Sequence, residues 1–197
     1  MSHRLSVMVS RRTILAAALL GLCAAAPARA GVEKFMRRCS DPRKSTLCPF
    51  FRPSVAVPDG WVEDKAATWR FDAVIIVPKG VAFNDAQAVI YAIAVYNRDK
   101  EPLAKFLPDA VADWKDRAKD ARISDLPDLP RGSGKPAFVR RAFEGPGLKE
   151  QGFELQAVTV DGDNDGNEFI VTITLSANSR EALQAAEPAY LAILGQY

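Results

Sequence analysis

Histidine is almost absent from this chain of 197 residues, which holds only His3. The residues that follow position 30 contain none at all. If the first thirty residues are removed from the protein, as argued below, three kinds of chemistry are excluded. These are nucleophile activation by a Ser-His-Asp or Cys-His arrangement, acid–base catalysis by imidazole near neutral pH, and metal ligation by histidine. No motif in the sequence indicates a particular reaction.

Cysteine is also scarce, with three residues at Cys23, Cys39 and Cys48. Cys39 and Cys48 cannot form a structural zinc site on their own, because such a site takes four ligands. In a protein outside the cytoplasm they are expected to form a disulfide, with two free thiols as the alternative. In the chain-entropy model a bridge closing so short a loop contributes about 2.5–3 kcal/mol.

Long apolar runs are missing as well. The run Ile14–Ala26 is too short for a bilayer core, which takes about 20 residues. It follows a basic segment without acids and precedes Ala28-Arg29-Ala30, which offers small residues at the positions that a signal peptidase reads. Residues 1–30 are therefore predicted to be a cleavable signal peptide. A retained membrane anchor is the alternative.

The export route is indicated by Ser10-Arg11-Arg12, which resembles the twin-arginine motif, although Ile14 and Ala16 depart from it. The general secretory route is the alternative. Either route implies a periplasmic or secreted protein without stable membrane insertion after cleavage. Removal of the signal leaves 22 basic residues against 24 acids, so the net charge changes from +2 to about −2. No nucleic-acid partner is therefore expected.

Residues 31–53 form an N-terminal segment in which basic and aromatic side chains alternate around the predicted disulfide loop. Such a mixture can bind nucleic acid or anionic lipid. The favoured interpretation is a solvated basic loop whose phenylalanines pack onto the core. The residues concerned are Phe35, Arg37, Arg38, Arg43, Lys44, Phe50 and Phe51.

Strands and one helix are predicted for the middle of the chain. Residues 68–77 are β-branched and aromatic and predict a strand, and residues 88–96 predict a strand buried on both faces. Apolar side chains at helical spacing predict a helix over about residues 109–122, with Trp114 as a core residue. Residues 125–136, rich in proline and glycine, predict a surface loop.

The last sixty residues predict three strands, at 137–143, 153–160 and 168–175. A C-terminal helix follows, capped by Asn178 with Glu181 in a capping box, and Pro188 is expected to kink it or to mark its last turns.

This order of elements, together with the start Pro58-Asp59-Gly60-Trp61, resembles the PsbP-like/Mog1-like family. The resemblance implies an α+β fold over residues 54–197, in which an antiparallel β-sheet is covered by helices as an α/β/α sandwich. Members of the family are mostly non-enzymatic, and none of their functional residues can be matched here. The predicted function is that of an exported, periplasmic, non-catalytic binding or assembly-accessory protein with a protein partner.

One acidic loop suggests a different function. Asp161, Asp163 and Asp165, followed by Gly166, match the opening half of an EF-hand calcium loop, but position twelve is Thr172 instead of glutamate. Calcium binding by these three carboxylates is one hypothesis, and a solvent-exposed hairpin turn between two strands is the favoured alternative. No other cofactor is predicted.

A third hypothesis is a hydrolase that works with carboxylates alone. Many acids make some close pair of carboxylates inevitable, so the sequence gives this hypothesis no specific support. A cleft with two inward carboxylates, one of them with a raised pKa, would support it.

Overall fold

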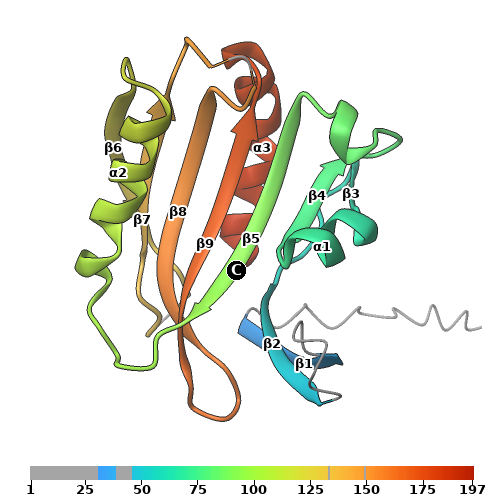
Figure 1. Ribbon diagram of the computed structural model, residues 1–197, viewed down its shortest axis with the longest axis vertical. Helices are drawn as coiled ribbons and strands as arrows, with labels where there is room; N and C mark the ends of the chain where they lie inside the picture. The colour runs from blue at the N-terminus through green and yellow to red at the C-terminus, as the bar shows by residue number, and fades with distance from the viewer. Residues whose placement is uncertain (1–30, 39–45, 133, 149) are drawn as a thin grey trace, which may run out of the picture.

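A seven-stranded antiparallel sheet forms the body of the protein (Figure 1). The structure is a computed structural model that describes residues 31–38, 46–132, 134–148 and 150–197. The strands follow the order β3-β4-β5-β9-β8-β7-β6, so β9 lies at the centre. Their bounds are β3 Trp61–Glu63, β4 Val74–Pro78, β5 Ala88–Tyr96, β6 Arg122–Leu129, β7 Phe138–Glu144, β8 Phe153–Gly162 and β9 Glu168–Ala177.

A separate two-stranded antiparallel ribbon, β1 (Gly31–Arg38) with β2 (Leu47–Ser54), precedes the sheet and is called the β1–β2 ribbon below. Phe51 of the ribbon packs against Phe169 of β9, with ring centroids 4.7 Å apart, and against Tyr96 of β5. The ribbon is thereby attached to the end of the sheet where β5 finishes and β9 begins.

The long helix α3 (Arg180–Gln196) covers one face of the sheet (Figure 1). Its apolar side packs on alternate residues of β5, β8 and β9 to form the main core. Tyr190 is fully buried there, and its hydroxyl donates to the carbonyl of Ile173 at 3.3 Å. Pro188 lies inside α3 without ending it.

The opposite face has much less helical cover. The short helices α1 (Lys65–Phe71) and α2 (Leu107–Arg117) lie toward its two sides, and the centre between them is free of helix (Figure 1). The 3₁₀ turns η1 (Phe83–Asp85) and η2 (Leu103–Lys105) complete the described elements.

The predicted fold class is therefore wrong. The protein is mainly β, and it is not an α/β/α sandwich whose sheet is covered by helices. The physical reason is that α1 and α2 are too short to shield a seven-stranded sheet. The family resemblance now rests only on element order and on the Pro58–Trp61 motif.

Two local predictions are also wrong. Residues 68–77 form the end of α1 and then β4, because Asp64 caps α1 and accepts a hydrogen bond from the Ala67 amide at 3.0 Å. Asp72 ends the helix with a positive φ of 54°, and the chain returns as β4. Much of the predicted loop at 125–136 belongs to β6.

Other predictions are confirmed. The strands expected at 88–96, 137–143, 153–160 and 168–175 correspond to β5, β7, β8 and β9. The helix expected at 109–122 is α2, which stops at Arg117 because Ala118 is extended. The C-terminal helix is confirmed as α3, but its predicted cap, Asn178, is wrong by one residue: Ser179 caps α3, since its side chain accepts from the Ala182 amide at 3.1 Å.

Both edges of the sheet are poor templates for another strand. The edge strand β3 has only three residues. The other edge, β6, contains Pro127, and its pairing with β7 shifts register between Leu126 and Leu129. Proline lacks the amide hydrogen that a further strand would need.

Within the described ranges, no helix is both long enough and apolar enough to cross a bilayer. The predicted signal peptide, residues 1–30, lies outside them.

Candidate functional site

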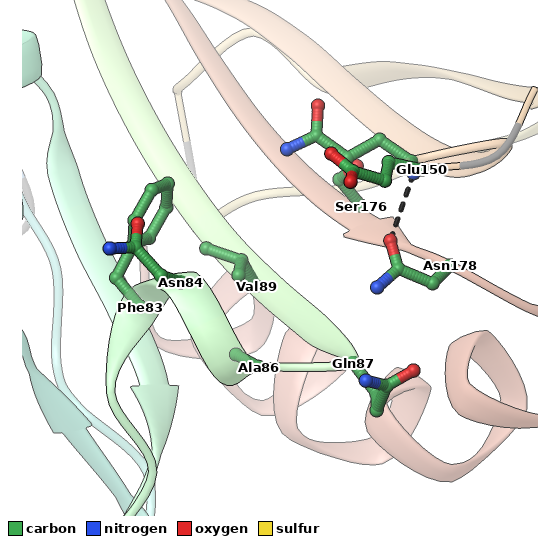
Figure 2. A pocket seen from close by; sticks show the side chains of 9 residues that line it. Phe83, Asn84, Ala86, Gln87, Val89, Glu150, Ser176 and Asn178 are labelled. Atoms are coloured by element: carbon green, nitrogen blue, oxygen red, sulfur yellow. Dashed lines mark hydrogen bonds between the residues drawn. The ribbon is translucent and has the colours of Figure 1, made fainter.

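Two adjoining cavities lie on the face of the sheet opposite α3, one in its helix-free centre and one beside α2, and together we call them the central cleft. The first cavity, of about 490 Å³, lies between η1 on one side and the ends of β9 and the β7–β8 connection on the other. Figure 2 shows Phe83 and Asn84 across from Ser176 and Asn178, with Val89 between them. The Asn178 side chain accepts a hydrogen bond from the Gln151 amide at 2.9 Å, which holds that rim in place.

The second cavity, of about 450 Å³, lies between the sheet and α2. The sheet contributes Tyr91, Glu154 and Gln156, and the helix contributes the side chains of one face. The helical lining residues are Ala110, Asp113, Trp114, Asp116 and Arg117.

Strand pairing makes the two cavities neighbours. Ser176 of the first cavity is the direct cross-strand partner of Glu154 of the second. Ser176 also pairs with Val89 on its other side, and the next row along the sheet joins Tyr91, Thr174 and Gln156. Directly opposed residues in an antiparallel pair have Cβ atoms about 5 Å apart, so the two rows form one continuous floor.

Glu154 is the most unusual group of this floor, because its side chain is only 5% exposed. The indole nitrogen of Trp114 donates to its Oε2 at 3.2 Å, and a guanidinium nitrogen of Arg117 lies 3.8 Å from its Oε1. Burial raises the pKa of Glu154, while Arg117, Trp114 and Ser176 act in the opposite direction and only partly offset it. Glu154 therefore holds its proton more tightly than an ordinary glutamate.

Trp114 holds α2 against the sheet. Its ring stacks on Phe143 of β7, with centroids 5.4 Å apart, and the Arg117 guanidinium lies 4.5 Å from its centre on the helix side. The predicted core position of Trp114 is confirmed, since it is 3% exposed. The indole N–H of Trp114 also fixes the position of the Glu154 carboxyl group, which lines the second cavity.

The neighbouring polar groups are neutral. The hydroxyl oxygens of Thr174 and Ser176 are buried, and these residues lie beside Tyr91 and Glu154, whose pKa values their hydroxyls act to lower. Burial raises the pKa of Tyr91, and the nearby Glu154 adds to this. The floor thus combines neutral donors and acceptors, which can bind an uncharged polar group such as an amide.

The acidic loop at 161–168 connects β8 and β9 as a hairpin turn, as the favoured alternative predicted. Asp161 pairs with the buried Arg131 and lies 3.6 Å from Lys135. Asp163 accepts hydrogen bonds from the amides of Asp165 and Asn167, each at 2.9 Å.

These contacts affect the pKa of Asp163 and the ion pairing of Asp165. Slight desolvation acts to raise the pKa of Asp163, but the hydrogen bonds from Asn167 and Asp165 outweigh it and lower that pKa. Asp165 points instead to Lys34 at 3.4 Å.

The three carboxylates of the calcium hypothesis are thus directed to different partners. Among the described residues no group of three or more His, Cys, Asp or Glu side chains is placed to hold a metal ion. A calcium ion would have to compete with Arg131 for Asp161. Calcium binding stays an untested hypothesis.

The predicted disulfide is only half within the described part of the chain. Cys48 lies in β2, opposite Arg37 of β1. Cys39 lies outside the described residues, so the bridge stays a prediction.

Comparison with known proteins gives no family model that matches the chain and no curated protein that is similar to it. The cleft is therefore interpreted from its own chemistry. Sequence reasoning missed Tyr91, Glu154 and Ser176 as site residues. One signal could have found Glu154, since it is an acid inside the otherwise largely apolar strand β8.

Proposed function

We propose that this protein is exported and acts in the periplasm as a non-catalytic binding or assembly-accessory protein, with the central cleft as its binding surface. The observation that carries the proposal is a strip of sheet between η1 and α2 that is floored by neutral polar groups. Among these groups Tyr91 and Gln156 are partly exposed in the second cavity, so a ligand can form hydrogen bonds with them directly.

The chemistry of the floor favours a protein partner. A polypeptide presents amide groups that match the hydroxyl of Tyr91 and the side-chain amide of Gln156. The cleft borders β5, β8 and β9 away from the sheet edges, so the partner is expected to lie across the face of the sheet instead of extending it.

A photo-crosslinking amino acid placed at Gln156 tests this proposal in living cells. The matched control is Gln184, an exposed residue of α3 on the other side of the sheet. We expect one dominant adduct from position 156, identified by mass spectrometry, and none from position 184. Adducts of equal yield from both positions, or none from either, would contradict a binding role for the cleft.

A carboxylate hydrolase is a second candidate, favoured by the raised pKa of Glu154 in a cavity that Asp113 and Asp116 also line. Glu154 would act as the general acid. Hydrolysis of a chromogenic glycoside that is lost in Glu154→Gln and kept in Glu181→Gln, at an exposed position of α3, would put this candidate first.

A further inference from the structure

The first cavity of the central cleft is lined mainly by uncharged side chains that both donate and accept hydrogen bonds. Four of them are carboxamides and one is a hydroxyl, on Asn84, Gln87, Gln151, Asn178 and Ser176. Among the described residues that line the cavity, Glu150 is the one acid and none is basic. The described lining therefore offers many hydrogen bonds to an uncharged ligand and no opposite charge to an anionic one.

The carboxamides come from three segments that hydrogen bonds hold together. The backbone amide of Asn178, directly after β9, donates to the carbonyl of Gln87, directly before β5, at 3.0 Å. The amide of Gln151, in the β7–β8 connection, donates to the Asn178 side chain at 2.9 Å. Asn84 belongs to η1, which leads into Gln87. The four carboxamides are thus positioned before a ligand binds, which lowers the cost of binding it.

Most polar atoms of these carboxamides are accessible to a ligand. The side chains of Asn84, Gln87 and Gln151 are exposed and make no hydrogen bond with any described residue. The side-chain nitrogen of Asn178 makes none with the described residues either, while its oxygen accepts from Gln151. A carboxamide presents both donors and an acceptor, and so does a hydroxyl group. A ligand with several hydroxyls can therefore pair with several of these side chains.

The cavity also has an apolar side. Phe83, Ala86 and Val89 line it, and Figure 2 shows Val89 between Phe83 and Ser176. The Phe83 ring packs on Phe71 of α1, with centroids 5.2 Å apart. Ligand sites commonly combine such apolar and aromatic side chains with a few polar groups that fix orientation. A ligand that suits both parts has an apolar face and an edge that carries hydroxyls.

A saccharide ring has this combination of groups. Its hydroxyls project around the edge and its C–H bonds cover the faces, so it can contact the carboxamides and Phe83 together. An extended polypeptide suits this cavity less, because its backbone donors and acceptors follow one line, whereas Asn84 and Asn178 lie on opposite sides of the cavity (Figure 2). The cavity volume of about 490 Å³ lies within the range of small-molecule sites, about 300–1,000 Å³.

We propose that the first cavity binds one ring of a neutral saccharide. The carboxamides bind the hydroxyls, Phe83 packs on the ring face, and an anionic sugar is disfavoured because Glu150 repels it. This site is distinct from the polypeptide contacts of the proposed function, which lie at Tyr91 and Gln156 in the second cavity. The adduct expected from position 156 needs no saccharide, so either proposal can fail while the other holds.

A chemical-shift titration by NMR tests the site, with isotope-labelled protein purified as the cell processes it. The neutral probes are chitotriose, cellotriose and maltotriose. A trimer of galacturonic acid is the anionic probe, and acetyl-trialanine amide is the peptide probe. We expect at least one neutral trisaccharide to bind with a Kd of about 1 mM or lower, with shifts centred on residues 84–89 and 176–178. The anionic and peptide probes should bind at least about tenfold more weakly.

Matched carboxamide variants give the control. Asn84→Ala and Gln151→Ala each remove a group that lines the cavity and should weaken binding about fivefold, the usual effect of one neutral hydrogen bond. Asn164→Ala, in the β8–β9 turn, and Gln184→Ala, on α3, should bind as the unchanged protein does. All four positions are exposed, so the variants are expected to fold.

Three results would overturn the proposal. The first is that no neutral trisaccharide binds at about 10 mM. The second is that the anionic or the peptide probe binds more tightly than every neutral one. The third is that the cavity variants and their controls lose binding equally.

Discussion

Glu154 is a carboxyl group held in the middle of β8 with almost no contact with water. Because folding raises its pKa, the folded state binds this proton more tightly than the unfolded state does. The free energy of unfolding therefore falls as the pH rises from the ordinary glutamate range through the raised pKa. At pH values below the ordinary glutamate pKa, Glu154 is protonated in the folded and the unfolded state, and its ionisation does not reduce the free energy of unfolding.

Glu154→Gln tests this at the scale of one residue. The glutamine keeps the shape and has no proton to lose, so the variant should gain stability relative to the unchanged protein as the pH rises. Urea unfolding at pH values from about 4 to 8 measures the difference. Glu150→Gln, at an exposed position, should show no such slope. A difference that is flat with pH for Glu154→Gln would mean that Arg117 and Trp114 fully offset the burial.

At the scale of the element, α1 exists because Asp64 satisfies an amide of its first turn. Asp64→Ala should lower the free energy of unfolding by about 1 kcal/mol, the usual effect of losing such a cap. The neighbouring exposed Lys65→Ala should change it by less than about 0.5 kcal/mol. Equal effects of the two variants would mean that the cap does not hold this helix.

The strands that are long and apolar could be predicted from the sequence, and the elements with mixed signals could not. Three of the residues 68–71 are β-branched or aromatic, but the segment follows a capping aspartate, and the cap decides the structure. Proline at 127 suggested a loop, but an edge strand tolerates it. The site residues Tyr91, Glu154 and Ser176 come from three strands, and only the pairing of β5, β9 and β8 brings them together. No local pattern encodes that juxtaposition.

At the scale of the whole molecule, Arg131 joins distant parts of the chain. Its side chain is fully buried and donates to Thr159 and to the carbonyl of Val160, each at 3.2 Å, and it pairs with Asp161. It also reaches the carbonyl of Tyr197 at 3.4 Å, and the Tyr197 hydroxyl donates to the carbonyl of Gly31 at 3.2 Å. The start of the ribbon and the last residue are thus held to β8.

Arg131→Met should therefore destabilise the whole protein. Removal of Arg131 leaves the largely buried Asp161 with only the more distant Lys135 at 3.6 Å, so the cost should approach, but not exceed, about 3–5 kcal/mol, the cost of a fully unmatched buried charge. The exposed Arg122→Met should cost less than about 0.5 kcal/mol. Urea unfolding of the two variants gives the comparison, and equal midpoints would show that Arg131 does not join these segments.

The short β3 and the proline-bearing β6 have a consequence for how the protein behaves at high concentration. Open sheet edges recruit one another into fibrils when a protein is concentrated, and this protein closes both. We therefore expect that concentrated protein does not associate through the edges of its seven-stranded sheet, so that contacts with other molecules involve other surfaces.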